Sequence, residues 1–185
     1  MIKTTVFLVL TMVIMTPLAL ADSQRDSQLE FAGTLEETLG HFWALELNLD
    51  EKNSKLALVH ATHPIAELYD TMSEHLENNF DFDAKLQETL LDLQNKATTT
   101  VSRQQAQNAI DDAKDIIEEA RSIVVDEELT NDTSFKLQLA NALLETAKVE
   151  YNEAVSDGVI EEMAEFQMAL HLFGVHNKYL IVLMD

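Results

Sequence analysis

Apolar residues recur at intervals of three and four over most of the chain, which is the period of an α-helix. The clearest example is residues 102–125, where alanine, isoleucine and valine keep to one stripe of the helix surface. The same spacing predicts further helices at 29–48, 55–61, 64–78, 81–98, 135–156 and 159–183. No segment indicates credible strand pairing. We therefore expect an all-α protein of roughly six or seven helices.

Short polar segments separate the predicted helices. Residues 50–54 form one such segment, with Ser54 a candidate cap for the helix that follows. His63-Pro64 predicts a break, because proline disfavours helical geometry in the residue before it. Asp157-Gly158 indicates a tight turn between the last two helices. These breaks are compatible with two architectures, an up-down helical bundle or an irregular array of helical hairpins.

The N-terminus has the pattern of a secretory signal peptide over residues 1–21. Lys3 gives the positive start, residues 6–15 are apolar except for one threonine, and a small-x-small motif ends at Ala21. The apolar run is short for a membrane span, which needs about 20 residues. We expect cleavage to leave residues 22–185 as a single extracytoplasmic domain, in the periplasm, a pseudo-periplasm or at the cell surface. An uncleaved N-terminal membrane anchor is the alternative.

Composition narrows the class of partner. The 33 acidic and 12 basic residues give a net charge of −21, which disfavours binding to nucleic acid or to an anionic membrane surface. The absence of cysteine excludes disulfides, iron–sulfur clusters and cysteine-type zinc sites. Only 2 prolines and 4 glycines leave little turn chemistry for an all-β fold. Hydrophobic residues at 46% are sufficient for a core.

The most specific sequence pattern lies in the predicted hairpin around the Asp-Gly turn. It consists of Leu143-Leu144, Tyr151, Ala154-Val155, Asp157-Gly158, Glu165 and Phe173. The pattern resembles the extracytoplasmic helical region of prokaryotic iron permeases of the high-affinity iron-transporter family, and related secreted helical domains of archaea. Phe166 stands where that pattern has a second tyrosine. Residues 60–67 are also similar to the start of the archaeal domains.

The resemblance includes none of the membrane helices of the permeases, so it does not imply iron transport itself. It implies a free-standing helical domain linked to iron or copper handling, or to respiratory redox proteins of the cell envelope. The expected partner is accordingly an envelope protein or a metal/redox protein. After signal cleavage the chain is not expected to span a membrane.

Histidines and glutamates at helical spacing form a candidate metal site. His60, His63 and Glu67 are separated by three and four residues, and the Pro64 break would gather them around one corner. Imidazole and carboxylate together suit zinc, copper or iron(II). A residue of the last helix would complete the shell. The candidate ligands are His60, His63, Glu67, Glu165 and His171.

A purely structural interpretation of the same residues remains open. His60 and His63 can stabilise helix ends, and Glu67 suits a first helical turn. His41 and His75 are expected at the surface or its boundary, and Trp43 in the core. No catalytic sequence motif occurs, so an enzyme is the least favoured class. The alternative to metal binding is a metal-free structural or adaptor subunit that docks an envelope complex through its acidic helical surface.

Overall fold

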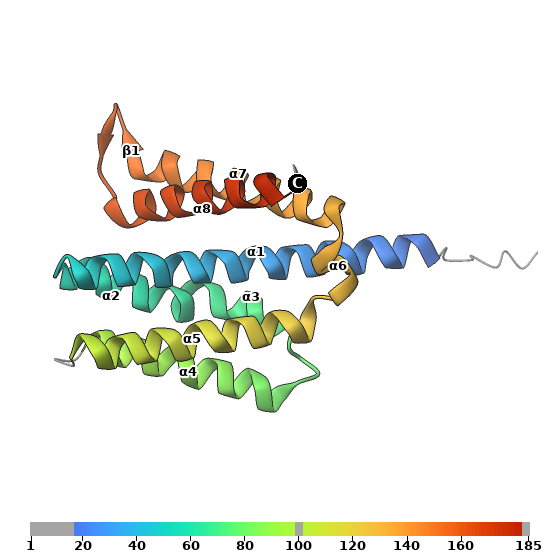
Figure 1. Cartoon of the computed structure of the whole chain (residues 1–185), viewed down its shortest axis with the longest axis horizontal. Helices are drawn as coiled ribbons and strands as arrows, with labels where there is room; N and C mark the ends of the chain where they lie inside the picture. Colours follow the sequence, from blue (N-terminus) through green and yellow to red (C-terminus); the bar gives the residue numbers. More distant parts are fainter. Residues whose placement is uncertain (1–16, 99–101, 183–185) are drawn as a thin grey trace, which may run out of the picture.

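The computed structural model of the protein describes residues 17–98 and 102–182. The chain forms three helical hairpins that lie side by side (Figure 1). They are α1 (Pro17–Asp50) with α2 (Ser54–His63), α4 (Phe80–Thr98) with α5 (Arg103–Val124), and α7 (Thr133–Ala154) with α8 (Met163–Val182). The expected all-α array is thereby confirmed. Most of the predicted signal peptide lies outside the described residues, so its cleavage stays a prediction.

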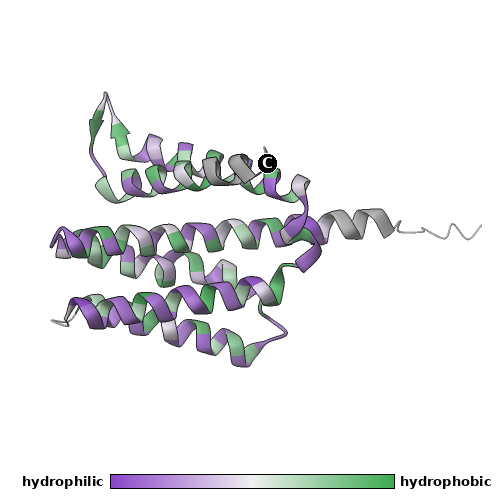
Figure 2. Cartoon of the chain, viewed as in Figure 1, coloured by the Kyte–Doolittle hydropathy of each residue, from purple (hydrophilic) through white to green (hydrophobic). Residues whose placement is uncertain are grey.

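Helix α1 lies between the other two hairpins and contacts α2, α5, α7 and α8 (Figure 1). Its apolar side chains Phe31, Leu35 and Phe42 are fully buried. Because α1 is covered from several sides, polar residues of this helix are buried as well. They are Gln28, Thr34, Glu36, Thr38, His41 and Asn48. Figure 2 shows hydrophilic and hydrophobic residues interspersed along the helices, as amphipathic packing requires.

The predicted break at His63-Pro64 is wrong. The backbone of His63 is helical (φ −55°, ψ −43°), and α2 runs directly into a π-helical turn, η1 (Pro64–Leu68), followed by α3 (Tyr69–Glu74). Proline has no N–H to donate, and a locally widened turn accommodates the missing hydrogen bond. The helical path therefore continues past Pro64. His60 and His63 lie in the last turns of α2, just before the π-helical turn.

Among the described residues, two short β-strands lie at the tip of the α7–α8 hairpin. Strand β1 (Val155–Ser156) pairs antiparallel with β2 (Val159–Ile160), so the expectation of no strand pairing is wrong for these residues. Asp157 (φ 51°) and Gly158 (φ 78°) both have the positive φ that a tight two-residue hairpin turn needs.

Helix starts follow the capping chemistry of the sequence. Ser102 and Gln105 form a capping box at the start of α5, and the Asp132 side chain accepts from the backbone N–H of Phe135 at the start of α7. Asn53, rather than Ser54, caps α2. A short helix, α6 (Glu127–Asn131), occupies the acidic link between α5 and α7. Among the described helices, none is long and apolar enough to cross a membrane.

Candidate histidine site

Four histidines from three helices gather on one side of α1. His41 comes from α1, His60 and His63 from α2, and His171 from α8. The Nδ1 atoms of His41 and His60 are 3.1 Å apart, and the rings of His41 and His63 lie edge to face with centroids 5.1 Å apart. His171 is close enough to influence the ionisation of His41. Three of the predicted ligands are therefore brought together, around a histidine that was not predicted.

His41 was expected at the surface or its boundary, and this expectation is wrong. Its side chain is buried because α2 and α8 both cover this part of α1. The sequence of α1 nevertheless contains a pattern that indicates the burial of His41. Thr34, Thr38, His41 and Asn48 follow one another at helical spacings of four, three and seven, and all are buried. A polar stripe of this kind on an otherwise apolar helix indicates a buried polar network.

A chain of hydrogen bonds assigns the protons of this network. Asn48 Nδ2 donates to the backbone oxygen of Ala44 and to Gln167 Oε1, each at 2.8 Å. Gln167 Oε1 therefore faces His60 Nε2, 2.9 Å away, and accepts its proton. His60 Nδ1 is left with a lone pair and accepts from the Nδ1–H of His41. The lone pair of a neutral His41 is consequently on Nε2.

Burial favours the uncharged form of His41, His60 and His171. Desolvation, helped by the nearby His60, His63 and His171, holds the pKa of His41 well below its ordinary value. Burial lowers the pKa of His60 to about 4, although its hydrogen bond to Gln167 acts in the opposite direction. Burial also lowers the pKa of His171 to about 4. Neutral imidazole is the form that binds metal ions.

The two predicted carboxylate ligands lie elsewhere. The Glu67 side chain is 59% exposed, and its Oε2 is 3.7 Å from His63 Nδ1. Glu165 interacts with Glu150 of α7, and burial together with this neighbour raises the pKa of Glu150 to about 8. In the described part of the chain, no three His, Asp or Glu side chains are placed to hold one ion. Ligation by the predicted set therefore stays a prediction.

Gly40 and Trp43 define how α8 meets α1 beside the cluster. A Cβ on Gly40 would lie 2.7 Å from Met168 Cε and 2.9 Å from His171 Cδ2, so glycine permits the close approach. The rings of Trp43 and His171 are in contact, with centroids 5.2 Å apart. Trp43 was expected in the core but is 37% exposed. Its contact with His171 places it at the edge of the histidine cluster.

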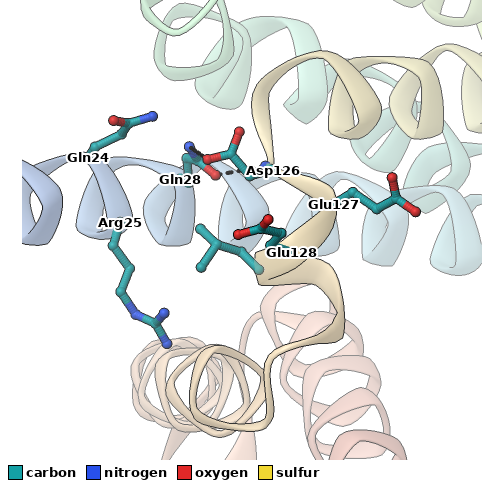
Figure 3. Close-up of a pocket in the computed structure, with 7 residues that line it drawn as sticks. Gln24, Arg25, Gln28, Asp126, Glu127 and Glu128 are labelled. Atoms are coloured by element: carbon teal, nitrogen blue, oxygen red, sulfur yellow. Dashed lines mark hydrogen bonds between the residues drawn. The ribbon is translucent and has the colours of Figure 1, made fainter.

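A separate polar hollow lies where α1 meets the link between α5 and α6 (Figure 3). Gln28 donates from Nε2 to Asp126 Oδ2 (2.9 Å) and accepts from the Asp126 backbone N–H (2.8 Å). Nearby, Arg25 forms an ion pair with Asp132 (2.7 Å), the residue that caps α7. Gln28 and Arg25 each bond a residue on the other side of this contact. We therefore interpret the hollow as a structural contact between α1 and the segment that links α5 to α7.

The fold and the cluster together define a helical-hairpin protein with a buried site rich in histidine. The family model for the iron permease-associated 4-helix bundle domain matches residues 126–172, which include α6, α7 and the first half of α8. The resemblance noted for the Asp-Gly hairpin is thereby confirmed. No curated protein and no solved structure matches the chain. Because α8 packs on both α1 and α2, the matched hairpin is half of a four-helix group that contains the histidines.

Proposed function

We propose that the protein is a non-catalytic, extracytoplasmic helical domain that binds a transition-metal ion in support of an iron-uptake system. The observation that carries this proposal is the cluster of four imidazoles from α1, α2 and α8, three of which burial keeps uncharged. The matched hairpin contributes His171 to this cluster. The proposed role places the ion next to an iron permease or another metal/redox protein of the envelope.

The chemistry of the donor set supports this assignment. Imidazole nitrogen is a ligand for zinc, copper and iron, and burial keeps His41, His60 and His171 in the form that can bind. Within the same network, Asn48 Oδ1 is buried and has no hydrogen-bond partner among the described residues. Nearly all buried polar atoms have a hydrogen-bond partner, so an acceptor without one, such as Asn48 Oδ1, is unusual.

Metal analysis of the purified protein tests the proposal. After incubation with iron(II), copper(II) or zinc and removal of free ion, we expect one bound ion per chain. The double variant His60→Ala/His63→Ala should lose it. His75→Ala is the matched control, because His75 lies apart from the cluster and contacts Ser27 and Phe31. Equal and negligible metal in all three proteins would contradict metal binding. Circular dichroism establishes that the variants are folded.

An adaptor role is the second candidate, and an apolar groove on the α7–α8 hairpin favours it. Its walls are formed by Leu144, Ala147, Lys148, Tyr151, Ala169, Leu170 and Phe173. Leu170 and Phe173 are more than half exposed. Contiguous exposed apolar side chains are typical of interaction sites.

Co-purification with a co-expressed iron permease tests the adaptor role. Leu170→Asp/Phe173→Asp should abolish an association that the wild-type protein shows. Leu137→Asp is the control, because Leu137 is an exposed apolar residue of α7 outside the groove. Association that survives the double substitution would exclude the groove as the docking surface.

A further inference from the structure

The contact between His41 and His60 has the dimensions of a pair of metal ligands. Two neutral imidazoles meet through their Nδ1 atoms at 3.1 Å, with one proton shared between them. Two nitrogen ligands of a tetrahedral ion lie about 3.4 Å apart when each metal–nitrogen bond is about 2.1 Å. An ion could therefore replace the shared proton with only a small movement of the two rings.

The other side of the His60 ring has the outer contact that metal-bound histidines usually make. A histidine ligand normally donates its second N–H to a carbonyl or carboxylate, which orients the ring. His60 Nε2 donates to Gln167 Oε1, and Asn48 holds that amide in place. Gln167 and Asn48 are themselves buried. These contacts orient the His60 ring before any ion arrives, so that only a small adjustment is needed when the ion binds.

His63 is the histidine best placed to supply a third nitrogen. Its ring is 5.1 Å from that of His41 and 6.5 Å from that of His60, measured between centroids. Its Nδ1 contacts the carboxylate of Glu67 at 3.7 Å, and Glu67 is largely exposed. A pair of this length with one exposed partner stabilises little. His63 can therefore turn from Glu67 toward the other two rings at small cost.

No three side chains of the described residues are placed around one ion. We propose that the rings of His41, His60 and His63 turn to form a nitrogen-donor metal site that binds copper or zinc in preference to iron(II) and manganese(II). The proposal rests on the metal-binding function proposed above and names its ligands and ion class. Affinity for nitrogen ligands rises from manganese and iron(II) to copper, with zinc below copper but above iron. Of the candidate carboxylates, Glu67 is largely exposed and contacts the outer side chain His63, and Glu165 interacts with Glu150. Neither is therefore placed between His41 and His60 to favour the harder ions.

Competition titrations with a chromophoric chelator test this selectivity on the metal-free protein. We expect copper(II) and zinc to bind at least about tenfold more tightly than iron(II) under anaerobic conditions, and more tightly than manganese(II). The electron paramagnetic resonance spectrum of the copper(II) form should show hyperfine coupling to nitrogen. Iron(II) binding as tightly as zinc would overturn the selectivity but would leave the metal-binding function intact.

Single substitutions test the ligand set. His41→Gln, His60→Gln and His63→Gln should each weaken zinc binding at least about tenfold, and Gln167→Leu about 10- to 100-fold. His75→Gln should have no effect, and Glu67→Gln should leave binding unchanged or tighten it, because it releases His63. His63→Gln and Glu67→Gln change exposed or half-buried side chains, so they remain informative if a core variant does not fold.

The outcomes separate the two proposals. Zinc or copper that binds one per chain with equal affinity in wild-type and His63→Gln proteins would overturn the ligand set alone. Failure of every ion to bind the wild-type protein would overturn both the site and the proposed function.

Discussion

The Nδ1 atoms of His41 and His60 lie 3.1 Å apart between α1 and α2, with both rings buried. This contact needs at least one uncharged ring, because it requires a lone pair on one nitrogen and a proton on the other. Two imidazolium rings at this distance would repel each other and would both lack water. The packing of α1 against α2 is therefore linked to the protonation of this pair.

The first prediction is a loss of stability in mild acid. The pKa of His60 is about 4 in the folded protein and near 6.5 when unfolded, so the unfolded chain binds more protons between these values. The stabilising contribution is complete above about pH 6.5 and is lost as the pH falls through about 4. Each such histidine contributes a slope of up to about 1.4 kcal/mol per pH unit. Urea unfolding between pH 7.5 and 4.5 measures the slope.

The variant His60→Gln isolates this effect from the rest of the charge. The chain carries a net charge of −21, and acid also relieves repulsion between its carboxylates. We therefore expect the wild-type protein to lose stability more steeply than His60→Gln as the pH falls. Parallel curves for the two proteins would show that the buried histidine does not govern acid stability.

The second prediction uses Trp43, which is the single tryptophan of the chain. Its ring contacts that of His171, whose pKa burial lowers to about 4. A protonated imidazole quenches indole fluorescence, so emission should fall with a midpoint near pH 4 while the protein is still folded. Circular dichroism at each pH verifies the fold.

The substitution His171→Gln should abolish this titration, whereas His75→Gln should leave it unchanged. A midpoint near the ordinary histidine value, or an unchanged curve in His171→Gln, would show that His171 is not shielded in the way the structure indicates.

Local periodicity predicted the helices well, since an amphipathic stripe depends on only one helix and its neighbours. The helix predicted at 102–125 agrees with α5 (Arg103–Val124), and Ser102 caps it as its sequence suggests. The Asp-Gly hairpin was also recognisable, because its turn chemistry is local.

Two features of the site depend on non-local packing and were missed. His41 is buried because α2 and α8 both cover α1. The polar stripe of α1 indicates a buried network but does not reveal which helices cover it. His63-Pro64 was expected to separate two helices, but a π-helical turn accommodates the proline and keeps His60 and His63 on one helical path. The histidines were therefore predicted in part, and their central member was not.

The third prediction concerns the carboxyl pair of Glu150 and Glu165. Burial and the neighbouring carboxylates raise the pKa of Glu150 to about 8, above its ordinary value of 4.5. The folded state therefore favours the protonated form, whose stabilisation is complete below about pH 4.5 and is lost as the pH rises through 8. Glu150→Gln imitates the protonated form and should be more stable than the wild-type protein at pH 9.

We expect a gain on the order of 1 kcal/mol, reduced by solvent screening because Glu150 is half-buried. Thermal unfolding at pH 5 and pH 9 measures it, and the gain should be small at pH 5. Glu161→Gln removes the same charge from an exposed residue and serves as the control. Equal effects of the two substitutions at pH 9 would attribute the gain to net charge and not to the pair.

The fourth prediction compares two glycines of α1 that differ in what surrounds them. Apart from its own helix backbone and its chain neighbours, a Cβ on Gly33 would meet no described atom within 4 Å, whereas one on Gly40 would lie 2.7 Å from Met168 Cε and 2.9 Å from His171 Cδ2. In a helix interior, alanine is preferred to glycine by about 0.5–1 kcal/mol. Gly33→Ala should therefore raise the free energy of unfolding by about that amount.

At Gly40 the same preference is opposed by overpacking, which typically costs about 1–3 kcal/mol. The end of the Met168 side chain can move, but the His171 ring is held between this contact and Trp43. Gly40→Ala should therefore be destabilising by about 1–2 kcal/mol, which lowers the melting temperature by several degrees. It should also shift Trp43 emission, because α8 is displaced and carries His171 with it. Equal stabilisation by both substitutions, with unchanged emission, would show that α8 does not approach α1 as closely at Gly40.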